Sequence, residues 1–193
     1  MTTKSSDRLS MVETRQEQFI DPLGFALFGL AREGSVPWVD VDTARQSLHL
    51  GPGEKHVANM VELDYPEFDF DRCDFRLPFA DGEIGGVIAT HVLEHLADPR
   101  PLIREVARVL APGCPFNVLV PYGNSLMYLQ DLDHKTPFVL DTWKNLLCNS
   151  HYDNHYGRPE IPLIIGANFK FAIKEGNEAL VTQLIKARQA PGR

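Results

Sequence analysis

The stretch GVIATHVLEHLADPRPLIREVARVLAPGCPFNVLVP, residues 86–121, carries the strongest structural signal in the chain. It begins with a short apolar run at residues 86–90 and ends with a second run at residues 116–120. Neither run alternates strictly between apolar and polar residues, which is typical of strands buried on both faces of a parallel sheet. We therefore expect two parallel strands here.

The residues between these two runs have the pattern of an amphipathic helix. Asp98 has the chemistry of an N-cap, Pro99 suits a first helical turn, and Pro112-Gly113 would end the helix. A strand, a helix and a strand over about 30 residues form a βαβ unit with a right-handed crossover. The apolar residues that recur at helical spacing are Leu102, Ile103, Val106, Val109 and Leu110.

Other apolar runs extend the expected sheet in both directions. Residues 47–50 and 60–63 form two short runs before the βαβ unit. Near the C-terminus, residues 169–173 and 179–185 flank a Gly-Asn turn, which predicts a β-hairpin. The fold class predicted is α/β, with a doubly wound, Rossmann-like, mostly parallel sheet and a C-terminal antiparallel hairpin.

Length and composition are those of one folded domain. The chain has 193 residues, of which 44% are hydrophobic. We expect residues 1–18 to form a flexible N-terminal tail and residues 19–193 to form a single domain. No apolar run approaches the ~18–20 residues that cross a bilayer. The polar N-terminal residues lack the apolar stretch of a signal peptide, so a cytoplasmic location is predicted and no membrane partner is expected.

Charge and cysteine content argue against a nucleic-acid-binding protein and against a protein stabilised by disulfides or zinc. The formal net charge is −7 and the sequence has no run of Lys or Arg. Nucleic acid is therefore not favoured as a partner, although it could still bind through a local basic patch on the folded surface. The three cysteines are widely spaced and form no CxxC pair, which argues against a disulfide framework and a thiolate zinc site.

A glycine turn and an acidic residue follow the first two expected strands. Gly51 and Gly53 would let a ligand approach the backbone without interference from a Cβ atom. The third glycine of a dinucleotide fingerprint is absent, which counts against a pyrophosphate site. Asp64, at the end of the second strand, could accept hydrogen bonds from both ribose hydroxyls, with Glu62 as the nearby alternative. A solvated acidic turn remains the competing interpretation.

The order of motifs resembles one family. After the glycine loop and the acidic strand end come Leu77-Pro78-Phe79-Ala80-Asp81-Gly82, a strand, and His91-Val92-Leu93-Glu94-His95-Leu96. A helix and Val109-Leu110-Ala111-Pro112-Gly113 follow. This order, over about residues 47–121, resembles the type-11 class I S-adenosylmethionine-dependent methyltransferases. A narrower pattern, residues 131–138 with Thr142-Trp143 and the hairpin, looks like a group of uncharacterised phage-encoded methyltransferase-like proteins.

This resemblance implies S-adenosyl-L-methionine as the cofactor and an unidentified small-molecule or protein methyl acceptor. Asp64 would hold the ribose hydroxyls, Asp74 would reach the adenine amino group, and Phe75 could line the ring. Thr90 and His91 would lie beside the sulfonium. The full set of implied cofactor-binding residues is Gly51, Gly53, Glu62, Asp64, Asp74, Phe75, Thr90 and His91. Three positions depart from the family pattern: Pro52 in the glycine loop, Ile84-Gly85-Gly86 in place of the usual Phe-Asp, and Gly113-Cys114 in place of Gly-Gly.

His134 and Asp133 are the candidate catalytic residues. Methyl transfer is an in-line displacement on an activated carbon, so alignment is its main requirement. A base is needed only where the acceptor is protonated, and His134 could supply it. The alternative is that Asp133-His134 merely pins a loop.

Two further functions stay open. His91-Val92-Leu93-Glu94-His95 also matches the HxxEH motif of inverted zinc peptidases. That motif needs a helix, whereas here it directly follows a strand-like run. His151, Asp153 and His155 have metal-ligand spacing but lie in a polar stretch typical of a solvated loop, so no metal site is predicted. A cofactor-free binding or structural module of the same fold is the other alternative.

Overall fold

The computed structural model describes residues 39–54, 56–57, 59–72, 74–147 and 161–188. The tail expected over residues 1–18 lies outside the described residues, as do His151, Asp153 and His155. Among the described residues, no helix is both long enough and apolar enough to cross a lipid bilayer.

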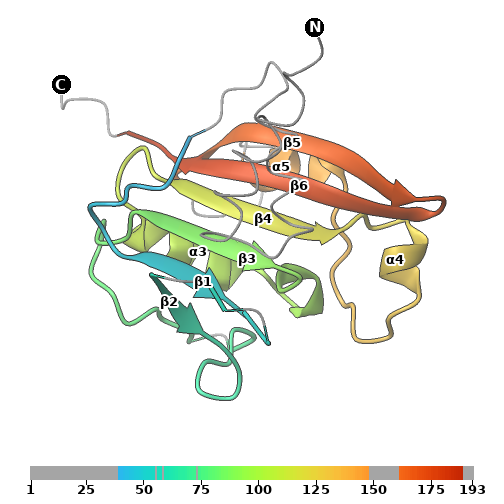
Figure 1. Ribbon diagram of the computed structural model, residues 1–193, viewed down its shortest axis with the longest axis horizontal. Helices are drawn as coiled ribbons and strands as arrows, with labels where there is room; N and C mark the ends of the chain where they lie inside the picture. The colour runs from blue at the N-terminus through green and yellow to red at the C-terminus, as the bar shows by residue number, and fades with distance from the viewer. Residues whose placement is uncertain (1–38, 55, 58, 73, 148–160, 189–193) are drawn as a thin grey trace, which may run out of the picture.

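A six-stranded mixed sheet forms the centre of the protein, with the strand order β2-β1-β3-β4-β6-β5 (Figure 1). Pairs β1–β2, β1–β3 and β3–β4 are parallel, whereas β4–β6 and β5–β6 are antiparallel. The predicted Rossmann-like sheet with its C-terminal hairpin is therefore confirmed. The strands are β1 (Ser47–Leu50), β2 (Met60–Leu63), β3 (Gly86–Thr90), β4 (Pro115–Pro121), β5 (Leu163–Lys174) and β6 (Asn177–Lys186).

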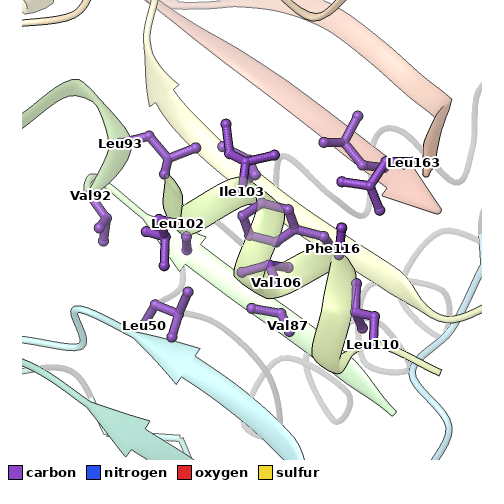
Figure 2. Close-up of a cluster of buried hydrophobic side chains, with 14 of the residues drawn as sticks. Leu50, Val87, Val92, Leu93, Leu102, Ile103, Val106, Leu110, Phe116 and Leu163 are labelled. Atoms are coloured by element: carbon purple, nitrogen blue, oxygen red, sulfur yellow. The ribbon is translucent and has the colours of Figure 1, made fainter. Parts of the chain in front are cut away.

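Helix α3 (Arg100–Val109) connects β3 to β4 and packs on the rear face of the sheet as viewed in Figure 1. Figure 2 shows Leu102, Ile103 and Val106 of this helix lying among Val87 and Phe116 of the strands. The side chain of Asp98 accepts a hydrogen bond from the backbone N–H of Arg100 at 3.0 Å. The helix begins at Arg100, so its N-cap is Pro99 and not Asp98, and the N-cap prediction is wrong by one residue.

Three further helical segments complete the described chain. The 3-10 helix η1 (Leu93–His95) follows β3, and α4 (Leu126–Leu129) follows β4. Helix α5 (Leu140–Leu147) packs behind the hairpin and contributes Trp143, whose side chain is fully buried beside Phe138 with ring centroids 5.3 Å apart. The sequence patterns did not predict these segments.

The strand register brings three residues to one edge of the sheet. Leu50 of β1 pairs with Leu63 of β2 on one side and with Ala89 of β3 on the other. The residues that follow, Gly51, Asp64 and Thr90, therefore lie together at the carboxyl edge. Strands β2 and β3 lie on opposite sides of β1, so the strand order reverses at β1. Such a reversal is a topological switch point, and open α/β sheets bind ligands at the carboxyl edge there.

Candidate functional site

The glycine turn after β1 has a left-handed backbone at both glycines. The φ angles are +59° at Gly51 and +56° at Gly53. A Cβ atom on Gly51 would lie 2.5 Å from Cγ2 of Val92, whereas a Cβ atom on Gly53 would meet nothing within 4 Å. Gly51 is thus required by backbone conformation and by packing, while Gly53 faces open space that a ligand could use.

Asp64 follows β2 directly and joins the glycine turn. Its Oδ2 accepts a hydrogen bond from the backbone N–H of Gly53 at 2.9 Å, and its Oδ1 accepts one from Tyr65 at 2.9 Å. Each carboxylate oxygen has about two lone-pair sites, so each keeps capacity for one more donor. The half-buried carboxylate can therefore hold the turn and also bind hydroxyl groups.

The backbone donors of the turn are already used. The N–H of Gly51 donates to the carbonyl oxygen of Leu63 at 2.8 Å, and the N–H of Gly53 donates to Asp64. Pro52 has no N–H. Phosphate groups bind where several free amides converge, so this turn is poorly suited to a pyrophosphate.

Glu62, the alternative ribose ligand, is occupied elsewhere. Its Oε2 lies 2.7 Å from Nδ1 of His56, and its Oε1 accepts from the N–H of Val57 at 3.0 Å. The hydrogen bond from His56 holds the pKa of Glu62 below its usual value. Glu62 thus fixes the connection between β1 and β2, which leaves Asp64 as the better candidate for a ligand.

Asp74 and Phe75 follow β2 on an outer loop. The exposed carboxylate of Asp74 accepts hydrogen bonds from Nε and Nη2 of Arg72 at 3.0 and 2.9 Å, which lower its pKa. Phe75 meets Phe70 edge-on, with ring centroids 5.3 Å apart. The structure thus shows an ion pair and an aromatic contact at these positions, and their adenine-binding roles stay predictions.

Thr90 and His91 form the third part of the edge. The hydroxyl of Thr90 is buried and has no hydrogen-bond partner among the described residues. His91 has a φ of +57°, and its N–H donates to the carbonyl oxygen of Leu119 at 2.9 Å. Unpaired buried hydroxyls and left-handed residues other than glycine are both uncommon, and both occur preferentially at functional sites. No pattern in the sequence predicts this backbone conformation.

His134 lies on the loop after α4, and its side chain is only 6% exposed. Its Nδ1 is 2.9 Å from the carbonyl oxygen of Tyr128, and its Nε2 is 3.6 Å from Oδ2 of Asp131. Asp131 therefore supplies the carboxylate beside His134. Asp133, the predicted partner, instead presents its backbone carbonyl to Nδ1 of His95 at 3.3 Å.

Glu94 is a site residue that pattern reasoning did not single out as a ligand. Its side chain is fully buried, Oε1 lies 3.1 Å from Nδ1 of His91, and Oε2 has no partner among the described residues. A carboxylate directly after the apolar pair Val92-Leu93 was the available signal, because charged side chains are rarely buried without a partner.

The geometry of the HxxEH segment does not favour the zinc peptidase. That enzyme places both histidines of the motif on one helical face. Here η1 spans only three residues, and His91 precedes it with a left-handed backbone. His91 and His95 therefore do not share a helical face.

Arg108 of α3 holds the Leu77–Gly82 motif in place. Its guanidinium donates to the carbonyl oxygens of Leu77 and Phe79 at 3.0 and 2.8 Å, and to Oδ1 of Asp81 at 2.8 Å. It also pairs with Oε2 of Glu105 at 2.8 Å. A single partly buried cation thus fixes the loop that leads into β3.

The Gly85-Gly86 departure from the family pattern has a packing reason. A Cβ atom on Gly85 would collide with the carbonyl oxygen of Asp42, and one on Gly86 would collide with the side chain of Val41. The two glycines let residues 41–42 pass closely over the start of β3.

Comparisons with known proteins agree with this architecture. Residues 24–116, slightly under half of the chain, match the type-11 family model described as a methyltransferase domain. A protein of Mycobacterium sp. (strain JLS), named an uncharacterized methyltransferase, is 31% identical over 90 residues, which cover 47% of this chain and 32% of that protein. A protein of Mycolicibacterium smegmatis (strain ATCC 700084 / mc(2)155), named as an S-adenosylmethionine-dependent methyltransferase, is 36% identical over 81 residues, which cover 42% and 31%. The matched region thus spans about a third of the length of these curated relatives, which are mycobacterial, and the phage resemblance stays a prediction.

Solved structures share the fold at low sequence identity. A candidate methyltransferase from Bacillus halodurans has a TM-score of 0.57 and 10% identity, covering 86% of this chain and 99% of its own. An S-adenosylmethionine-dependent methyltransferase from Mesorhizobium loti has a TM-score of 0.51 and 12% identity, covering 72% and 90%. The chain therefore has a Rossmann-like fold shared with S-adenosylmethionine-dependent methyltransferases and is similar to the methyltransferase-domain family over residues 24–116.

Proposed function

We propose that this protein transfers a methyl group from S-adenosyl-L-methionine to an acceptor. The observation that carries the proposal is the 2.9 Å hydrogen bond between the N–H of Gly53 and the carboxylate of Asp64. It joins the glycine turn to the acidic strand end at the switch point of the sheet. This is the arrangement that the family resemblance implies for adenosyl binding.

The residues at this edge fit an adenosyl group. Asp64 has remaining lone pairs for ribose hydroxyls, Gly53 leaves space above the turn, and Thr90 carries an unpaired buried hydroxyl. S-adenosyl-L-methionine would supply an activated methyl group on a sulfonium. The protein's task is then to hold the cofactor and to align an acceptor with it.

A small molecule or a protein is the acceptor that we favour. The formal net charge of −7 would repel a polyanion unless a local basic patch opposed it. His134 is the candidate proton acceptor, because the carbonyl oxygen of Tyr128 can only accept and so assigns the ring proton to Nδ1. In the neutral ring, Nε2 of His134 then carries the lone pair, and Asp131, 3.6 Å away, could stabilise the ring once it is protonated.

Replacing Asp64 with alanine is expected to weaken S-adenosyl-L-methionine binding by ~1.5–3 kcal/mol, or about 10–100-fold, because charge-assisted hydrogen bonds to the ribose are lost. Isothermal titration calorimetry of the full chain measures this change. Glu62→Gln is the control, since Glu62 is engaged by His56 and Val57. Equal affinity of the parent and Asp64→Ala, or a loss only in Glu62→Gln, contradicts the ribose assignment. An absence of binding to the parent at millimolar cofactor favours the cofactor-free module.

His134→Ala is expected to reduce turnover by about 10²–10⁴-fold if the acceptor must lose a proton, while the affinity for the cofactor is unchanged. The measurement is the rate of S-adenosylhomocysteine release in the presence of a metabolite extract, with cofactor affinity measured in parallel. An unchanged rate removes His134 from the catalytic residues.

A further inference from the structure

We propose that Glu94, His95 and His134 form a binding site for a divalent transition-metal ion. One ligand atom from each of these residues lies within 4.8 Å of the other two. Metal–ligand bonds of about 2.0–2.2 Å place the ligands of one ion roughly 3–4 Å apart. A small inward movement of side chains would therefore close the site.

Both imidazoles are already oriented as metal ligands. Nδ1 of His134 lies 2.9 Å from the carbonyl oxygen of Tyr128, and Nδ1 of His95 lies 3.3 Å from that of Asp133. A carbonyl oxygen only accepts, so each Nδ1 carries the proton and the neutral rings keep a lone pair on Nε2. Nε2 of His134 also lies 3.6 Å from Oδ2 of Asp131, so the ion would take the place of this contact. Metal-bound histidines almost always donate their other ring N–H in this way.

The carboxylate of Glu94 supplies the negative charge. Its side chain is fully buried, and Oε2 has no hydrogen-bond partner among the described residues. Burying a carboxylate oxygen without a compensating partner is costly, and a cation at Oε2 would provide that partner. His91, 3.1 Å from Oε1, lies outside the ligand set and can orient the carboxylate.

Backbone hydrogen bonds and ring contacts hold together the two segments that carry the three ligands. The ring of His134 lies between His95 and Tyr128, with centroid distances of 4.8 and 5.2 Å. The backbone carbonyl of Glu94 accepts hydrogen bonds from the N–H groups of Lys135 and Thr136 at 2.7 and 3.0 Å. The 3-10 helix and the loop after α4 thus form one connected unit.

Two imidazole nitrogens and one carboxylate suit Zn²⁺ or a similar first-row ion better than Mg²⁺ or Ca²⁺, which prefer oxygen ligands. Three protein ligands leave a coordination position open for water or an acceptor oxygen. A ligated His134 would act as a ligand and not as the base considered above. This site revises the sequence-based expectation of no metal, and it does not rest on the methyl-transfer proposal.

Titration of the chelator-treated full chain with zinc chloride tests the proposal. We expect saturable binding of one ion per chain, weakened at least about tenfold by Glu94→Gln, His95→Ala or His134→Ala. Zn²⁺ should also raise the melting temperature of the parent and not that of the variants, because a ligand stabilises only the state that binds it. The absorption spectrum of the parent with Co²⁺ reports nitrogen and oxygen coordination even where a variant does not fold.

His151→Ala/His155→Ala is the matched control, because it removes the other histidines with metal-ligand spacing. Its affinity for zinc should equal that of the parent. The proposal is overturned by an absence of saturable binding, by unchanged affinity after substitution of Glu94 and His134, or by loss of binding in the control alone. Cofactor titration is a separate measurement, so its failure would leave the metal site standing.

Discussion

Arg108→Ala should lower the free energy of unfolding by about 3 kcal/mol. The guanidinium is only 19% exposed and pairs with Glu105, whose side chain is 14% exposed. Removing it leaves the largely buried carboxylate with only the exposed Arg76, 4.0 Å away, as a cation, and it also removes the donors to Leu77 and Phe79. Urea denaturation of parent and variant measures the difference.

The control for this variant lies on the same helix. Arg100 pairs with Asp98, but both side chains are more than a third exposed, so Arg100→Ala should cost no more than about 1 kcal/mol. Equal costs for the two variants would contradict the role assigned to burial.

Acidic pH provides a second check. Burial raises the pKa of Glu105, but the hydrogen bonds from Arg108 and from the N–H of Leu77 outweigh it, so its pKa lies below the usual value. A carboxylate with a lowered folded pKa stabilises the protein above its unfolded pKa of about 4.3 and loses this contribution as pH falls through the folded value. The difference between the parent and Arg108→Ala should therefore shrink at low pH, and a constant difference would count against an ionic origin.

Gly51→Ala should destabilise the protein by about 2–4 kcal/mol and weaken cofactor binding. The left-handed backbone disfavours any Cβ atom, and this one would lie 2.5 Å from Val92. Thermal unfolding and titration with S-adenosyl-L-methionine measure the two effects.

Gly53→Ala separates these causes, because Gly53 has nearly the same φ angle and open space around it. We expect it to cost about 1–2 kcal/mol from the backbone alone. Val92→Ala in the Gly51→Ala background should restore part of the lost free energy of unfolding, because it removes the methyl group that the new Cβ atom would contact. Equal costs for the two glycine variants would exclude the contact with Val92 as the cause.

The central strands and α3 could be predicted because burial leaves a direct mark on their residues. The runs at residues 47–50, 60–63 and 86–90 coincide with β1, β2 and β3. All five residues predicted for the apolar face of α3 are fully buried. In these elements local pattern and tertiary packing demand the same residue types.

The hairpin and the C-terminal helices were harder to predict. Strand β5 begins at Leu163, whereas the prediction began at residue 169. The prediction missed the first residues because Gly166 and Asn168 interrupt the apolar run. The register with β6 shifts between Ile165 and Ala167, and a Cβ atom on Gly166 would lie 2.7 Å from Ile185. A bulge of this kind needs the partner strand for its explanation.

Strand ends alone determine where some of the candidate site residues lie. The expected proximity of the glycine turn and Asp64 is present because the register of a parallel pair aligns residues that follow each strand. Tyr128 and Asp131 could not be assigned to His134 from sequence, because a folded loop brings them together. The same holds for Glu94 of η1 and His134 of the loop after α4, which are far apart in the sequence.

The hydrogen bonds from Lys135 and Thr136 to Glu94 limit how this protein could be re-engineered. The ammonium of Lys135 also reaches Asp71 at 2.9 Å, and the hydroxyl of Thr136 donates to Leu96 at 2.7 Å. Residues 131–138 therefore cannot be replaced as a segment without affecting the rest of the fold. A segment grafted in their place must retain these two side chains, or it will also lose the contacts with Asp71 and Leu96.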